Sequence, residues 1–240
     1  MSAQPSAADD TAPLAPAPVT AMTVTRWRGG VGETLVDQLA EETPVAVLCN
    51  GEPHAVMLMS PADLDDFAVG FALTEGLIAT PRELLLVEQR ALDDGIELDL
   101  TIATRIKAAE TASQRAIAGR SGCGLCGKRM VEDALRTPPP VTTTTRVSRA
   151  AIARASVALA ARQPINQMTG AVHAAAWVSL DGEVMAVRED IGRHNALDKL
   201  IGARIKGSFG AGFVLVTCRA SYEIVMKAAL AGIDVLAAVS

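Results

Sequence analysis

The last part of the chain carries the pattern that most restricts the fold. An apolar run at residues 213–217, a helical segment at 221–231 and a second apolar run at 233–239 follow one another closely. Two strands joined by one helix over so short a distance form a parallel crossover, so the sequence predicts an α/β fold. Ligand sites in such sheets lie beyond the carboxyl ends of the strands, where the loop Cys218-Arg219-Ala220-Ser221 falls.

The rest of the sequence predicts a mixed sheet flanked by helices in the C-terminal half and a β-rich α+β portion before it. Asn50-Gly51 and Asp181-Gly182 are typical of hairpin turns, and Ser60 and Ser148 are expected helix N-caps. Strands are expected at 23–28, 44–50, 52–59, 84–87, 96–102, 172–179 and 184–187, and helices at 61–76, 128–136, 150–162 and 194–205.

Pro138-Pro139-Pro140 is the clearest internal boundary, because consecutive prolines favour a rigid extended spacer. We expect a disordered tail at residues 1–21, whose Ala, Pro, Ser and Asp content is typical of neither a signal peptide nor a membrane anchor. An N-terminal α+β portion then covers 22–137, a linker covers 138–147, and a C-terminal α/β portion covers 148–240.

The composition limits the partners and the compartment. Hydrophobic residues make up 50% of the chain, which favours a globular protein, and the net charge of -5 disfavours binding to nucleic acid. The four cysteines are too few and too irregularly placed for a secreted disulfide scaffold. We therefore expect a cytoplasmic protein whose C-x-x-C pair does metal or redox work.

The C-x-x-C pair consists of Cys123 and Cys126, in a glycine-rich loop at residues 119–128. Glycine permits backbone conformations that other residues avoid, so we expect an exposed and mobile loop. Arg120 and Lys128 lie close to the thiols in sequence and favour the thiolate form. Lowering a thiol pKa by two units raises its ionised fraction at pH 7 from about 3% to roughly three quarters.

Three other interpretations of the pair fit the sequence less well. A structural zinc site needs four ligands, and the chain has neither a second C-x-x-C nor paired histidines. A thioredoxin-like motif follows a strand and opens a helix, which the polar residues before Cys123 do not suit. Packing as small hydrophobes, which we assign to Cys49 and Cys218, does not suit a glycine-rich polar segment. A nucleophilic thiol that carries sulfur is the interpretation that remains.

A second group of polar side chains lies where an expected strand runs into an expected helix. Asp190 ends the strand, Gly192 permits a turn, and Arg193, His194 and Asn195 stand at the helix N-terminus. Free backbone N–H groups at such a terminus favour an anion, for example a phosphate or a pterin-type ligand.

Ordinary helix capping is the alternative for these residues, with Asp198 and Lys199 as a solvated pair. Arg219 and Ser221 follow a buried strand and open a helix, which again suits an anion. His173 lies among small residues, where a lone histidine is more often a hydrogen-bonded core group than a ligand.

Five segments together resemble the formate dehydrogenase accessory sulfurtransferases, the FdhD/NarQ family. They cover most of residues 45–240, in the order NGEPHAVMLMSPADLDDFAVGFALTEGLI, SGCGLCGK, TGAVHAAAW, EDIGRHNALDKLIG and RASYEIVMKAALAGI. The resemblance implies a cytidine deaminase-like α/β fold and a homodimer.

The resemblance also implies a function. Sulfur would be accepted from a cysteine desulfurase as a cysteine persulfide and delivered to the bis-molybdopterin guanine dinucleotide cofactor, on which formate dehydrogenase activity depends. By position, Cys123 would hold the persulfide and Cys126 would assist transfer. The protein would have no metal of its own. The cofactor, bound as substrate through its guanine nucleotide portion, would be faced by Asp190, Arg193, His194, Asn195, Lys199, Arg219 and Ser221.

The sequence departs from the family at two places. Thr217-Cys218-Arg219 stands where many members have a Ser-Gly-Arg-like turn. The family also continues beyond the position of Ser240, so we expect the C-terminal portion to lack the family's last helix and strand.

Two other classes of protein remain as alternatives. A zinc-dependent deaminase-like hydrolase would suit the fold, but such enzymes use a His or Cys with a nearby Glu and a Pro-Cys-x-x-Cys pair. His173 is followed by alanines, and no proline precedes Cys123. A chaperone that binds the molybdenum cofactor without a covalent bond would need no thiol chemistry.

Overall fold

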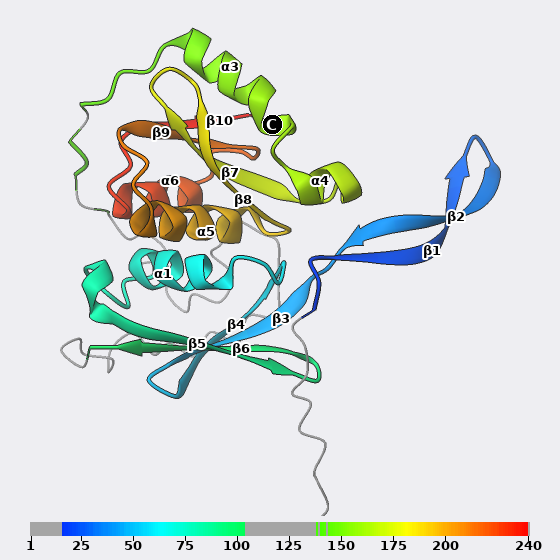
Figure 1. Ribbon diagram of the computed structural model, residues 1–240, viewed down its shortest axis with the longest axis horizontal. Coiled ribbons are helices and arrows are strands. Elements are labelled where there is room, and N and C mark those ends of the chain that lie inside the picture. The colour runs from blue at the N-terminus through cyan, green and yellow to red at the C-terminus, as the bar shows by residue number, and fades with distance from the viewer. Residues whose placement is uncertain (1–15, 104–137, 139, 143, 240) are drawn as a thin grey trace, which may run out of the picture.

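The structure is a computed structural model, and it describes residues 16–103, 138, 140–142 and 144–239. The cysteine loop expected at 119–128, with Cys123 and Cys126, and the helix expected at 128–136 lie outside the described residues. The described chain forms a body of two sheets with helices between them, and a two-stranded arm that projects from the body (Figure 1). The mixed α/β fold that the sequence predicts is confirmed.

The first sheet of the body belongs to the N-terminal portion. Its elements are β3 (Thr43–Cys49), β4 (Glu52–Met59), α1 (Leu64–Thr74), the 3-10 helix η1 (Pro81–Glu83), β5 (Leu84–Leu92) and β6 (Gly95–Ile102). The strand order is β4-β3-β6-β5, and both hairpins expected here are present. Alternate residues of β6 are buried from Ile96 to Ile102, and this apolar face packs with Phe67 and Phe71 of α1.

The second sheet belongs to the C-terminal portion and has the strand order β10-β9-β7-β8. The parallel pairing of β9 with β10 across α6 confirms the predicted crossover. Of the helices, α3 covers the outer face, while α5 and α6 lie between this sheet and α1 (Figure 1). The elements are α3 (Arg149–Ala160), α4 (Pro164–Thr169), β7 (His173–Ser179), β8 (Val184–Asp190), α5 (Arg193–Lys206), β9 (Gly212–Val216), α6 (Tyr222–Leu230) and β10 (Leu236–Ala238).

The expected N-cap of α3 is confirmed, and the structure also contains a short helix that the sequence does not predict. The Ser148 hydroxyl oxygen accepts a hydrogen bond from the Ala151 amide at 3.0 Å. The sequence does not predict α4, which begins at Pro164 and ends at Thr169, before Gly170, whose φ is 64°. The described residues of the linker expected at 138–147 form no helix or strand.

The two portions meet where α1 crosses α5. A Cβ atom added to Gly70 would lie 1.9 Å from the backbone oxygen of Asp198. One added to Gly202 would lie 1.9 Å from the backbone oxygen of Asp66. The contact is reciprocal, because each helix supplies an aspartate carbonyl and a glycine four residues later. The two helices therefore approach until their backbones touch.

Ser60 does not cap α1, so this expectation is wrong. The helix begins at Leu64, and the residue before it, Asp63, has a left-handed backbone with a φ of 55°. The Ser60 amide instead donates to the Asp190 carboxylate, and its hydroxyl oxygen accepts from the Ile191 amide. Ser60 therefore bonds to residues of the C-terminal portion instead of capping α1.

The arm consists of β1 (Val19–Arg28) and β2 (Val31–Ala40), which pair antiparallel. Gly29 and Gly30 join them with φ values of 56° and 82°, as a two-residue hairpin turn requires. The sequence predicts only the strand at 23–28, and β1 begins inside the range expected to be a disordered tail. None of the helices in the described part of the chain has the length and apolar content needed to cross a lipid bilayer.

We predict that Gly70→Ala destabilises the protein by about 2 kcal/mol. Alanine favours an exposed helix over glycine by about 1 kcal/mol, but an extra methyl group in a closely packed contact costs about 1–3 kcal/mol or more. Urea unfolding of the purified protein measures the difference. A variant that is more stable than the wild type would show that α1 and α5 do not touch at Gly70.

Candidate functional site

The carboxyl ends of β8 and β9 lie at the same edge of the second sheet. Both strands are antiparallel to β7, which stands between them and begins at this edge with His173. The loop after β8 leads into α5 at Arg193, and the loop after β9 contains Arg219 and Ser221. The predicted position of both loops beyond strand ends is confirmed, and we call this region the mouth.

Four of the predicted site residues, Arg193, His194, Arg219 and Ser221, lie at the mouth. Arg219 is exposed, and Arg193 is half-buried as the first residue of α5. The Ser221 hydroxyl is buried at the start of α6 and has no hydrogen-bond partner among the described residues. The mouth therefore combines guanidinium groups with two helix N-termini, which suits an anionic ligand.

His194 is held in the neutral form at the mouth. Its ring is 17% exposed, and its Nε2 atom lies 3.5 Å from a carboxylate oxygen of Glu223. Burial, together with the positive charges of Arg193 and Lys227, lowers the pKa of His194 from the ordinary 6.5 to about 3. A neutral imidazole can accept or donate a hydrogen bond without adding charge to the site.

His173 lies near His194, close enough for its charge to lower the His194 pKa. Its Nδ1 atom is 3.2 Å from the Thr217 carbonyl oxygen, and the Thr217 hydroxyl accepts from the Ala174 amide. The hydrogen-bonded role that the sequence favours for His173 is confirmed. Its position in the mouth could have been inferred from the antiparallel pairing of β7 with its neighbours.

Asp190 is a buried junction between the two portions. Its carboxylate accepts from the amides of Ser60 and Gly192 at 3.1 and 2.7 Å, and from the Asn195 side chain at 3.1 Å. The Lys199 ammonium group lies 2.6 Å away, and neither ionic side chain has measurable exposure. A buried carboxylate with four donors is held in one position.

Asn195 and Lys199 complete this junction. The Asn195 amide also donates to the Leu58 carbonyl oxygen, and Lys199 donates to that of Ser60. Asp190, Asn195 and Lys199 thus lie behind the mouth and bind the N-terminal portion. That these three residues contact the cofactor stays a prediction. In the structure they support the mouth from behind.

A second buried ionic cluster joins α6 to α5 and to the end of α1. Lys227 Nζ lies 2.8 Å from Asp198, 2.9 Å from the Thr74 hydroxyl and 3.3 Å from Glu75. Burial alone would lower the pKa of Lys227, but the neighbouring carboxylates outweigh burial and raise it. The interpretation of Asp198 and Lys199 as a solvated pair is wrong, since both are buried and each bonds to a partner elsewhere.

The two described cysteines are poor nucleophiles. Burial, with the charge of Asp99, raises the pKa of the Cys49 thiol to about 11. Burial also raises the pKa of Cys218, although Arg193 and Arg219 oppose this shift. Both thiols pack with hydrophobic side chains, as the sequence predicts.

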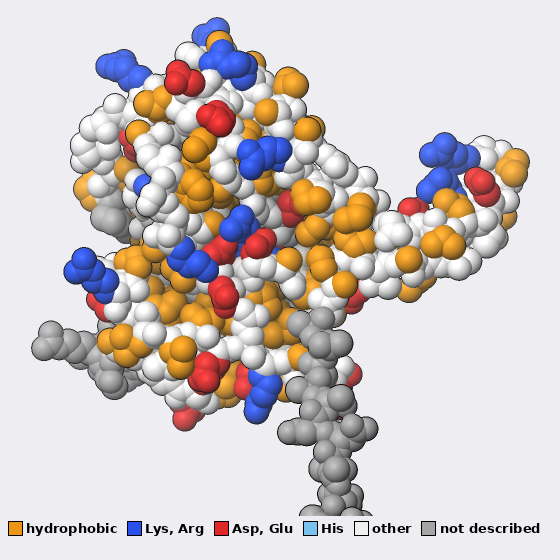
Figure 2. Space-filling model, in the orientation of Figure 1, with side chains coloured by type: hydrophobic (Ala, Val, Ile, Leu, Met, Phe, Trp, Pro, Cys, Tyr) orange, Lys and Arg blue, Asp and Glu red, His pale blue; other side chains and the backbone are white. Residues whose placement is uncertain are grey.

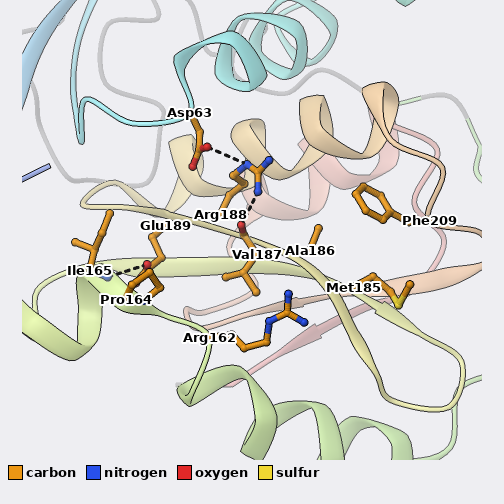
Figure 3. Close-up of a pocket in the computed structure, with 10 residues that line it drawn as sticks. All are labelled: Asp63, Arg162, Pro164, Ile165, Met185, Ala186, Val187, Arg188, Glu189 and Phe209. Atoms are coloured by element: carbon orange, nitrogen blue, oxygen red, sulfur yellow. Dashed lines mark hydrogen bonds and ion pairs between the residues drawn. The ribbon is translucent and has the colours of Figure 1, made fainter. Parts of the chain in front are cut away.

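A separate pocket of about 380 Å³ lies beside β8 (Figure 3). It contains none of the residues predicted to face the cofactor. Its polar groups are already bonded within the chain, since Glu189 accepts from the Ile165 amide at 3.0 Å and Arg188 pairs with Asp66 at 2.6 Å. No group of three or more His, Cys, Asp or Glu among the described residues could hold a metal ion.

We predict that His194→Gln makes stability less sensitive to acid. The unfolded chain binds a proton at this residue below about pH 6.5, whereas folded His194 stays neutral down to about pH 3. The wild type should therefore lose stability relative to the variant as the pH falls from 6.5, by up to about 1.4 kcal/mol per pH unit. Urea unfolding at pH 7.5, 6 and 5 tests this. A difference in unfolding free energy between wild type and variant that stays the same at all three pH values would contradict it.

Comparison with known proteins identifies relatives of this chain. Residues 40–240 match the model of the FdhD/NarQ family. A sulfur carrier protein FdhD of Xanthomonas campestris pv. campestris is 50% identical over 220 residues, which cover 91% of this chain and 78% of the relative. A sulfur carrier protein FdhD of Cupriavidus necator is 48% identical over 219 residues, covering 90% and 76%.

A solved structure supports the fold. It is that of a protein from Desulfotalea psychrophila described as a formate dehydrogenase accessory protein, which superposes with a TM-score of 0.69 at 22% identity. The match covers 92% of this chain and 83% of that protein. Because the family model matches most of the chain and the curated relatives share about half of its residues, the chain belongs to the FdhD/NarQ family.

Proposed function

We propose that this protein is a sulfurtransferase that accepts sulfur from a cysteine desulfurase as a cysteine persulfide. It delivers the sulfur to the bis-molybdopterin guanine dinucleotide cofactor, on which formate dehydrogenase activity depends. The observation that carries the proposal is the 50% identity, over 91% of the chain, with relatives named sulfur carrier proteins. The C-x-x-C pair supplies the thiols that such a carrier needs.

The persulfide is assigned to Cys123, with Cys126 assisting transfer. The other two thiols are unsuited, because Cys49 and Cys218 are packed among apolar side chains and their pKa values are raised. A thiol with a raised pKa is protonated at pH 7 and attacks slowly.

The loading step is a thiol exchange. The Cys123 thiolate attacks the outer sulfur of the persulfide on the desulfurase, and a new S–S bond forms. The S–S bond of the desulfurase breaks, and its cysteine leaves as a thiolate. No net oxidation occurs, so the step needs no further reactant.

The mouth is the proposed site for the cofactor as substrate. Arg193 and Arg219 supply positive charge, and the starts of α5 and α6 present backbone N–H groups toward an anion. Ser221 has a buried hydroxyl for a further hydrogen bond. Because His194 is neutral, the positive charge of the site comes from the two arginines.

We predict that Cys123→Ala abolishes persulfide formation at the loop. Mass spectrometry after incubation with a desulfurase and cysteine should find one added sulfur atom in the wild type and in the matched controls Cys49→Ala and Cys218→Ala. Addition of sulfur to Cys126 in the Cys123→Ala variant would overturn the assignment. Full activation of formate dehydrogenase by that variant would favour the non-covalent chaperone.

We predict that Arg219→Gln weakens binding of guanosine diphosphate, the portion of the cofactor that carries guanine and phosphate, by about ten- to a hundredfold. Loss of a charge-assisted hydrogen bond to phosphate costs about 1.5–3 kcal/mol. Isothermal titration calorimetry measures this, with Arg154→Gln on α3 as the control. Unchanged affinity would remove Arg219 from the site, whereas persulfide loading of Cys123 should be normal in both variants.

Stoichiometric zinc in the purified protein would favour the deaminase-like alternative. Metal analysis by mass spectrometry distinguishes the two classes, because the sulfur carrier needs no resident metal.

A further inference from the structure

The groups of the mouth that suit an anion are hydrogen-bond donors. Arg193 and Arg219 carry guanidinium groups, and the starts of α5 and α6 present backbone N–H groups. These donors suit phosphate, but they do not recognise a ring whose edge itself carries N–H groups. Figure 2 shows basic and acidic side chains mixed over one face of the molecule, so the selection of a ligand depends on individual groups. A ring of this kind needs a particular acceptor in the mouth.

Two carboxylates near the mouth are already engaged. Asp190 is completely buried and accepts hydrogen bonds from four donors. Glu223 lies 3.5 Å from the ring of His194. A further carboxylate would also compete with a bound phosphate for the arginines. An uncharged acceptor avoids this competition.

His173 reaches the mouth because of the strand directions. It is the first residue of β7 and pairs with Asp190, the last residue of β8. Ala175, two residues later, belongs to the core cluster that contains Leu197 of α5 and Ile224 of α6. Alternate side chains of a strand point to the same face of the sheet. The side chain of His173 therefore lies on the face where α5 and α6 begin.

The hydrogen bond of His173 to the chain fixes its tautomer. Nδ1 lies 3.2 Å from the backbone oxygen of Thr217, and a carbonyl oxygen can only accept. Nδ1 therefore carries the proton, and the neutral ring has its lone pair at Nε2. The Thr217 hydroxyl oxygen accepts from the Ala174 amide at 2.8 Å, and the Thr217 amide donates to the Ala174 carbonyl oxygen at 3.0 Å. The partner of the imidazole is thus held in the sheet.

The Nε2 atom of His173 is available to a ligand. The residue is half-buried, and Nε2 makes no hydrogen bond within the described part of the chain. It is also not one of the described side-chain atoms that are buried without a partner. An unprotonated imidazole nitrogen accepts a hydrogen bond without adding charge to the site.

We propose that His173 determines the specificity of the mouth by accepting, at Nε2, a hydrogen bond from an N–H group of the substrate's heterocyclic ring. The ring is the amino-oxopyrimidine that guanine and the pterins share, which presents a ring N–H and an amino group on one edge. This inference rests on the proposed function, because it names the part of that substrate which the mouth recognises. The arginines bind phosphate, and His173 selects the ring.

Nuclear magnetic resonance of the full chain with isotopically labelled histidine tests the tautomer. The chain has three histidines, so the signals of His173 are assigned by comparison with His173→Gln. At pH 8 the ring of His173 should have a protonated Nδ1 and an unprotonated Nε2. Addition of guanosine diphosphate or pterin should shift the Nε2 resonance. A ring protonated at Nε2 alone would overturn the proposal, because that nitrogen could not accept.

Isothermal titration calorimetry tests the contact with guanosine diphosphate, pterin and inorganic pyrophosphate as separate probes. His173→Leu should weaken binding of at least one of the two ring-bearing probes by about three- to tenfold, the loss expected for one uncharged hydrogen bond. Pyrophosphate has no ring, so its affinity should stay unchanged. His173→Gln, whose amide oxygen can replace the Nε2 acceptor, should recover most of the lost affinity.

The pattern of losses identifies the ring. Weaker binding of guanosine diphosphate alone would place guanine beside His173, and weaker binding of pterin alone would place the pterin there. Unchanged affinity for both ring-bearing probes would overturn the proposal, as would a wild type that binds neither. An equal loss for all three probes would also overturn it, since His173 would then have only a structural role. Persulfide loading of wild-type Cys123 is measured separately, so sulfur carriage can stand when the ring contact fails.

Discussion

The backbone contact between α1 and α5 is the constraint on which the rest of the structure depends. Gly70 and Gly202 let the helices approach closely, and this brings Lys199 within reach of the N-terminal portion. A buried ion pair loses much hydration energy and recovers it only when all its hydrogen bonds are made. We infer that the two buried ionic clusters, to which α5 contributes Lys199 and Asp198, stabilise a single orientation of the two portions, since any shift would leave charges without partners.

The mouth depends on this orientation although its own residues belong to the C-terminal portion. Asp190 ends β8 three residues before α5 begins at Arg193, and its carboxylate accepts a hydrogen bond from the Ser60 amide of the other portion. The hydrogen bond between Asp190 and Ser60 therefore fixes the position of Arg193 and His194 at the start of α5. Binding residues placed on rigid elements and supported by a bonded layer hold their geometry better than residues on free loops.

Local patterns in the sequence predict most elements of the fold and the position of the two loops that form the mouth. The Asn50-Gly51 hairpin and the cap at Ser148 depend only on neighbouring residues, and both are present. Ser60 was misread because its hydrogen-bond partners are 130 and 131 residues away. Asp198 and Lys199 are adjacent opposite charges on one helix, a pattern that suggests solvent exposure. The crossing of α1 over α5 buries both side chains instead. Such long-range partners leave no local signal in one sequence.

Following labelled sulfur from donor to enzyme is the most direct test of covalent carriage. The protein is loaded by a desulfurase with sulfur-labelled cysteine, purified, and mixed with formate dehydrogenase whose cofactor lacks the added sulfur, without any other sulfur source. The label should leave the carrier and appear in the dehydrogenase, in proportion to the formate oxidation gained. Activation of the dehydrogenase while the label stays on the carrier would contradict a sulfurtransferase role.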